Sequence, residues 1–218
     1  MFEQSVALPI FPSHIWLHQV AAAAAVAPLN QQLLASLEDL MGPRPALPPG
    51  ATWQSEQTLH QYKEFADLVG LVRGATKGVL DAQAIIYKDF VITGCWANMN
   101  PPGAPHPSHN HPNNLLSGVY YVAVPDGVDM ISFHDPRPQR HIIEPRTSQQ
   151  NEFNQFVHNV QVREGTLAIF PAWLPHSVIP NNTDALRVSI AFNIMLSDFA
   201  ETISPPIWSG VKLRRPPP

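Results

Sequence analysis

Residues 187–194 alternate strictly between large apolar side chains and polar or small ones, and this alternation constrains the fold more than any other feature. Successive side chains of an extended strand point to opposite faces of a sheet. We expect the apolar face to pack on helices or on a second sheet, and it consists of Val188, Ile190, Phe192 and Ile194. The other face consists of Arg187, Ser189, Ala191 and Asn193. These residues favour a polar, ligand-binding barrel interior, because a purely structural barrel fills its interior with apolar side chains.

The chain beyond residue 84 is a series of short β-rich segments separated by turns of Pro, Gly, Asn and Asp. Their number and spacing predict a mainly β sandwich or barrel. The content of 24 prolines agrees with a loop-rich β fold better than with a helical bundle. The β-rich segments lie at 85–87, 90–99, 115–124, 130–133, 156–162, 165–170 and 185–194.

The first 84 residues are predicted to be a helical support region packed outside the barrel. Residues 5–18 have the pattern of an extended edge segment broken by prolines, and 42–52 form a loop rich in Pro and Gly. Apolar residues recur at helical spacing within 19–41 and 58–84. The sequence has no internal repeat and no evident linker. We therefore expect one domain over 1–218, divided into a helical region 1–84, a β core 85–196 and a C-terminal tail 197–218.

Composition excludes several classes of partner. A net charge of −4 and a pI near 6.2 offer no basic surface for nucleic acid. No apolar run is long enough to form a transmembrane helix. The alanine-rich stretch 21–27 follows Glu3 and two prolines without any Lys or Arg, unlike a signal peptide. The single cysteine, Cys95, cannot form an intrachain disulfide. We expect a cytoplasmic protein with no nucleic-acid or membrane partner, and a homodimer is one assembly that the sequence allows.

Three histidines are candidate metal ligands, because neutral imidazole is the commonest protein metal ligand. His109 and His111 lie two residues apart in front of the strand 115–124, so both rings can point to the same side. His176 follows the strand 165–170 and a proline-rich turn, which can bring it to the same end of a barrel. A His-x-His pair alone is more typical of a solvated polar loop than of a metal site, and His176 alone is typical of a turn. The inward-facing Arg187, eleven residues after His176, strengthens the hypothesis, because a guanidinium binds a carboxylate through two hydrogen bonds.

In this order the residues resemble the Fe(II)- and 2-oxoglutarate-dependent oxygenases, which have a double-stranded β-helix (jelly-roll) fold. In that family a His-x-Asp or His-x-Glu pair precedes a strand, a distal His follows, and an Arg or Lys beyond it binds the far carboxylate of 2-oxoglutarate. His109-x-His111, His176 and Arg187 occupy these places. The segment 119–122, Val-Tyr-Tyr-Val, is similar to a strand of prolyl hydroxylase-like members in which the second Tyr, here Tyr121, contacts the same carboxylate.

The resemblance extends over about residues 90–195 and is strongest to a bacterial and phage family of such oxygenases. It implies an enzyme that binds Fe(II) through His109, His111 and His176 and 2-oxoglutarate through Arg187 and Tyr121. It implies O2 as the second co-substrate and hydroxylation of a small molecule, an amino acid or a peptide side chain. Asn98 and Asn193 are further candidates for binding co-substrate or substrate, and both can equally be residues of the barrel wall.

The departure from the family pattern is His111, because the usual facial triad has two His and one carboxylate. Three neutral ligands leave Fe(II) with its full charge, and a three-His set also suits Zn(II). Asp135 is an alternative source of a carboxylate, as a ligand or as a hydrogen-bond partner of a ligand. His106, His134 and His141 are expected in loops or around the ligands, not as ligands.

Two other functions remain open from the sequence. One is a three-His, cupin-type dioxygenase that does not use 2-oxoglutarate, in which Arg187 binds the substrate's own carboxylate. The other is a non-catalytic jelly roll that binds a metal or a small acid.

Overall fold

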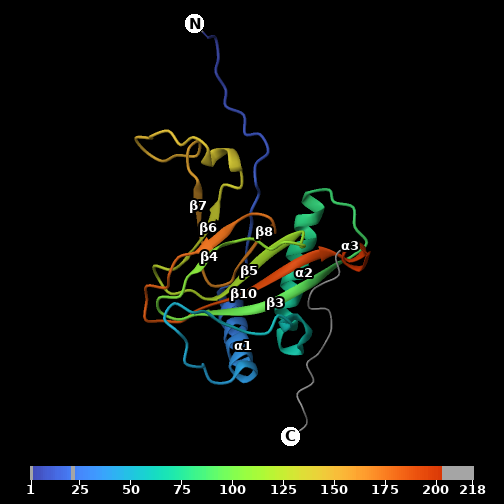
Figure 1. Cartoon of the computed structure of the whole chain (residues 1–218). Coiled ribbons are helices and arrows are strands. Elements are labelled where there is room, and N and C mark those ends of the chain that lie inside the picture. Colours follow the sequence, from blue (N-terminus) through green and yellow to red (C-terminus); the bar gives the residue numbers. More distant parts are fainter. Residues whose placement is uncertain (1, 21–22, 203–218) are drawn as a thin grey trace.

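The computed structural model describes residues 2–20 and 23–202, and its elements form two antiparallel sheets with two long helices on one side (Figure 1). The larger sheet has six strands in the spatial order β1 (Trp16–Gln19), β8 (Thr166–Pro171), β5 (Leu116–Ala123), β10 (Arg187–Leu196), β3 (Phe90–Asn100) and β2 (Trp53–Gln54). The smaller sheet has the order β4 (His106–His109), β9 (His176–Val178), β6 (Met130–His134) and β7 (Val157–Gln161). The predicted mainly β class is therefore confirmed.

The helices belong almost entirely to the N-terminal region, as predicted. They are α1 (Ala23–Met41) and α2 (Ala66–Ala82), with 3-10 turns at Leu59–Gln61 and Lys63–Phe65 before α2. A further 3-10 turn spans Pro138–His141, and the short α3 (Ser197–Thr202) follows β10. The rest of the predicted tail, 203–218, lies outside the described residues. None of the helices in the described part of the chain is long and apolar enough to cross a membrane.

The structure differs from the sequence expectations at four places in the strands, the first of which is the two-residue β2, which was not predicted. Residues 85–87 are not a strand, although they are apolar, because they form the connection between α2 and β3. The strands β4 and β9 were not predicted. Each is short, and the sequences His-Pro-Ser-His and His-Ser-Val lack an apolar alternation that would indicate a strand.

β10 lies between β5 and β3, and its apolar face packs on the helices, as the alternation predicts. Its four apolar residues belong to one buried cluster with side chains of α1 and α2, among them Leu33, Leu37, Leu68 and Val72. A second cluster fills the space on the opposite side of β5 and β8 and includes Tyr121, Ile131, Phe133 and Phe170. The two clusters hold the six-stranded sheet between the helices and the smaller sheet.

A buried polar contact connects α1 to β5. The Nδ2 of Asn30 donates to the backbone oxygen of Val122 at 2.7 Å, and its Oδ1 accepts from the hydroxyl of Tyr120 at 2.8 Å. Asn30 is only 4% exposed, so both of its polar ends need a partner inside the protein. These bonds flank Tyr121, whose side chain points to the opposite face of β5.

Gly118 gives room for the core at the centre of the larger sheet. It lies opposite Phe192 in the pairing of β5 with β10. A Cβ added to Gly118 would lie 2.2 Å from the Phe192 ring and 2.6 Å from the backbone oxygen of Ala168. Any larger residue would therefore displace the ring or separate two paired strands.

We expect Gly118→Ala to destabilise the protein by about 1–3 kcal/mol, the usual effect of overpacking a core. Gly74→Ala is the matched control, because no atom lies within 4 Å of its added Cβ and it is in the interior of α2. Alanine should leave stability unchanged or raise it by up to about 1 kcal/mol there. Urea unfolding followed by circular dichroism measures both, and equal stability of the two variants would contradict this account of Gly118.

Candidate functional site

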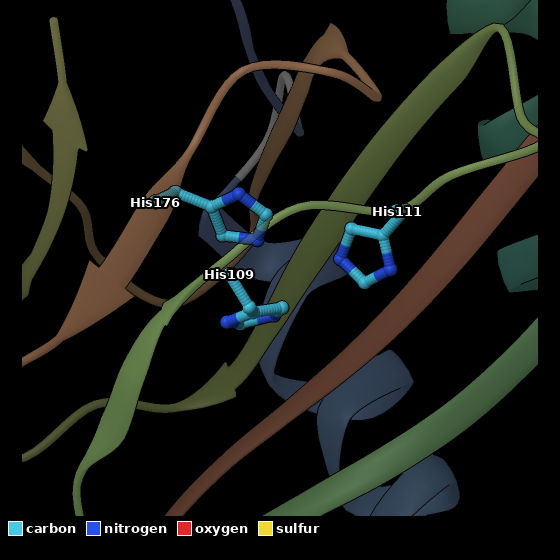
Figure 2. A group of neighbouring side chains, drawn as sticks. All are labelled: His109, His111 and His176. Carbon is cyan, nitrogen blue, oxygen red and sulfur yellow. The ribbon is translucent and has the colours of Figure 1, made fainter. Parts of the chain in front are cut away.

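His109, His111 and His176 converge on one space at the end of β4 and β9 (Figure 2). His109 ends β4 and pairs with His176, the first residue of β9. His111 follows in the loop, where its backbone N–H donates to the oxygen of Ala172 at 2.8 Å. One nitrogen of each imidazole lies within 4.8 Å of those of the other two. The structure thus brings together the three histidines that the sequence selects.

Backbone oxygens orient two of the rings. The Nδ1 of His176 lies 3.0 Å from the oxygen of Leu174, and the Nδ1 of His109 lies 2.8 Å from that of Pro107. A ring nitrogen that donates to a carbonyl carries the hydrogen, which leaves the lone pair of a neutral imidazole on Nε2. Such a bond fixes both the tautomer and the direction of a metal-ligating histidine.

Burial keeps His111 and His176 neutral. It lowers the pKa of His111 to about 3, with a further contribution from the two neighbouring rings. It lowers the pKa of His176 to about 4, against a smaller opposing effect of the hydrogen bond to Leu174. Both rings therefore have a free lone pair at neutral pH, which is the state that binds a metal.

Asp135 does not join this group. Its carboxylate pairs with Arg137, with Nη2 to Oδ2 at 2.7 Å and Nε to Oδ1 at 2.9 Å. The backbone N–H of Arg137 donates to the same Oδ1 at 3.1 Å. Among the described residues, the cluster of potential metal ligands thus contains three imidazoles and no carboxylate.

A cavity adjoins the three histidines, and the polar face of β10 forms part of its wall, as predicted. Arg187, Ser189 and Ala191 line it, together with Asn98 and Tyr121. The Oδ1 of Asn98 accepts from Gln54 Nε2 at 2.6 Å, so this amide is both a cavity residue and a part of the wall.

Asn193 is on the same face of β10 but is not among the residues that line the cavity. Its Oδ1 accepts from the hydroxyl of Ser117 at 2.6 Å, and both residues are buried. Asn193 thus contacts a residue of the neighbouring strand β5, the alternative that the sequence also allowed, and its contact with a ligand stays a prediction.

Arg187 is a buried cation whose bonding is incomplete. It is 2% exposed, its Nε donates to the oxygen of Val128 at 3.1 Å, and its Nη2 has no hydrogen-bond partner. Its Cζ lies 5.3 Å from the centre of the Tyr121 ring. The Tyr121 hydroxyl makes no hydrogen bond of good geometry, and burial raises its pKa to about 12 against the opposing effects of the charge and a weak side-chain contact of Arg187. A buried charge with a free donor beside a free hydroxyl is a site prepared for an anion.

His106, which the sequence placed in a loop or around the ligands without a role, is a cavity residue. It is the first residue of β4 and lines the same cavity, and its buried Nε2 has no partner. Burial lowers its pKa to about 4, with smaller effects of His109 and Arg187, so the ring is neutral. The available signal was the local excess of histidine between residues 106 and 141.

The Ser117–Asn193 contact can be tested by a double-mutant cycle. Asn193→Ala should cost about 1–3 kcal/mol of stability, because it leaves a buried hydroxyl without its partner. The double variant with Ser117→Ala should lose less than the sum of the two single changes, since neither partner is then left unpaired. Chemical denaturation measures the coupling, and strictly additive losses would contradict the contact.

Comparison with protein families matches residues 94–193 to the family described as "Putative 2OG-Fe(II) oxygenase". The matched range contains every histidine, tyrosine, asparagine and arginine considered above except the residues of the helical region. A search of curated protein sequences finds no match.

Several solved structures have the same fold. A prolyl-4-hydroxylase from Pseudomonas putida is 16% identical, with a TM-score of 0.58 over 84% of this chain and 93% of that one. HygX from Streptomyces hygroscopicus, solved with nickel and 2-oxoglutarate, is 13% identical, with a TM-score of 0.57 over 85% and 83%. The alpha-ketoglutarate-dependent carbocyclase SnoK from nogalamycin biosynthesis is 15% identical, with a TM-score of 0.60 over 84% and 79%. These similarities confirm the double-stranded β-helix fold.

Proposed function

We propose that this chain, which belongs to the 2OG-Fe(II) oxygenase family through residues 94–193, oxidises a small molecule, an amino acid or a peptide side chain with Fe(II), 2-oxoglutarate and O2. The observation that supports the proposal is that one cavity contains both a group of potential metal ligands and a buried cation with a free hydrogen-bond donor. Three converging imidazoles lie at one place in its wall, and a buried guanidinium with a free donor lies at another.

The three imidazoles suit a divalent transition metal. His109, His111 and His176 would hold Fe(II), with their Nε2 atoms as donors where Nδ1 is bonded to the backbone. Because the ligands are neutral, they leave the charge of the ion uncompensated. A bound dianionic co-substrate would balance that charge. In the usual triad, the carboxylate ligand already balances part of it.

Arg187 and Tyr121 suit the second carboxylate of 2-oxoglutarate. The free Nη2 and the free hydroxyl can both donate to it, and the positive charge of Arg187 strengthens these bonds. Apolar side chains such as Val119, Ile131 and Phe170 complete the cavity wall and keep water from these groups. Fe(II) and 2-oxoglutarate, when bound, supply the activation of O2, with release of succinate and CO2 and oxidation of the substrate.

The known relatives of the fold support a small or peptide substrate. HygX has been solved with hygromycin B as well as 2-oxoglutarate, and the Pseudomonas protein is a prolyl-4-hydroxylase. The loop between β6 and β7, residues 135–156, extends away from the helices (Figure 1), and it can contribute to a substrate site. The cytoplasmic location and the homodimer stay predictions of the sequence.

The metal site is tested by anaerobic titration with Fe(II) and 2-oxoglutarate, which should give a weak visible charge-transfer band. His176→Ala should weaken Fe(II) binding by more than about 100-fold, since even an outer partner of a ligand is worth 10–100-fold. Asp135→Asn is the matched control and should retain the iron, because this carboxylate is outside the cluster. Loss of iron in Asp135→Asn, or its retention in His176→Ala, would contradict the proposed ligand set.

The co-substrate site is tested by Arg187→Met, which should raise the Kd for 2-oxoglutarate by about 10- to 100-fold through the loss of charge-assisted hydrogen bonds. Arg163→Met is the control, because this arginine is exposed and bonds to Gln19 outside the cavity. Titration of the charge-transfer band gives both affinities. Substrate-dependent oxygen uptake without 2-oxoglutarate would instead support the three-His dioxygenase that binds its substrate's carboxylate at Arg187.

A further inference from the structure

Three buried polar atoms without partners face the same cavity: Tyr121 Oη, Arg187 Nη2 and His106 Nε2. The proposed function uses the first two and leaves His106 unexplained. A buried polar atom that lacks a partner is destabilising, so three in one cavity call for a common ligand.

His106 lies near both the metal ligands and Arg187 of the proposed site. Its ring centre lies 6.3 Å from that of His109, and its residue pairs with Val178 across β4 and β9. Arg187 is close enough to disfavour a positive charge on the ring. His106 is nevertheless outside the group of imidazoles that converge within 4.8 Å of one another.

The chemistry of His106 makes it a donor to an anion. A neutral imidazole carries one N–H, and either nitrogen can hold the hydrogen. Beside a guanidinium, the favourable arrangement places the hydrogen on Nε2 and an anion between the two donors. A carboxylate has about four acceptor positions on its two oxygens, so it can satisfy Arg187, Tyr121 and His106 together.

We propose that His106 is a positioning residue that donates the third hydrogen bond to the distal carboxylate of 2-oxoglutarate, and so makes the cavity selective for dicarboxylic 2-oxo acids. This inference rests on the proposed function. In this proposal His106 determines which 2-oxo acid binds, whereas His109, His111 and His176 bind the metal.

The test compares two acids that differ only at the far end. 2-Oxoglutarate carries the distal carboxylate, and 2-oxopentanoate has the same chain length with a methyl group in its place. Binding of each to the Fe(II)-loaded protein is measured anaerobically by the charge-transfer band and by calorimetry. His106→Leu should weaken 2-oxoglutarate by about tenfold or more, the effect of one hydrogen bond to a charged group, and leave 2-oxopentanoate within about twofold.

Two further variants separate the proposed role from a structural one. His106→Gln keeps an N–H donor and should restore most of the affinity for 2-oxoglutarate. His134→Leu is the matched control, because this histidine bonds to Ser177 and is not among the cavity residues, and it should leave both affinities unchanged.

Each contrary outcome has a definite meaning. Equal weakening of both acids in His106→Leu, loss of iron in that variant, or unchanged 2-oxoglutarate affinity would overturn the role of His106 while the proposed function stands. A wild-type protein that binds Fe(II) but not 2-oxoglutarate would overturn the proposed function, and the inference with it.

Discussion

The pairing of β10 with both β3 and β5 is the constraint on which the rest of the molecule depends. It directs Val188, Ile190, Phe192 and Ile194 into the core against the helices and Arg187, Ser189 and Ala191 into the cavity. A slip of one residue would exchange the two faces, burying a guanidinium among apolar side chains and exposing the core residues to the cavity. The same register therefore determines both the stability of the sheet and the polarity of the site.

The site has a positive charge that no neighbouring anion compensates among the described ligand residues. The cavity contains a buried guanidinium and four imidazoles, three of which are kept neutral by burial, and among the described residues no carboxylate belongs to the cluster of potential ligands. Burial without a counter-ion disfavours the charged form of Arg187 and lowers its pKa. A metal cation would add to the positive charge. The binding of a dianion is then the event that compensates both cations, so metal and co-substrate should support each other's binding.

The sequence predicted the parts of the site that lie on regular strands or carry a distinct motif. Arg187 followed from the alternation, the three histidines from their residue type and spacing, and Tyr121 from the family resemblance. β4 and β9 could not be predicted, because they lack alternating apolar residues and are strands only through their pairing with neighbouring strands. For the same reason the sequence left open whether His106 lies in a loop or around the ligands, and did not indicate that it lines the cavity. Asn193 shows a different limit, since alternation gives the face of β10 on which it lies but not which residues of that face line the cavity.

The hydrogen bonds of Asn30 to Tyr120 and Val122 connect the cavity to a residue that does not line it. They hold the backbone on both sides of Tyr121 against α1, on the face of the sheet opposite the cavity. They restrain the backbone at Tyr121 before a ligand binds, which lowers the conformational entropy that binding costs. The described residues of α1 do not line the cavity. The packing of α1 nevertheless preorganises the site, and in this way it contributes to the affinity for an anion.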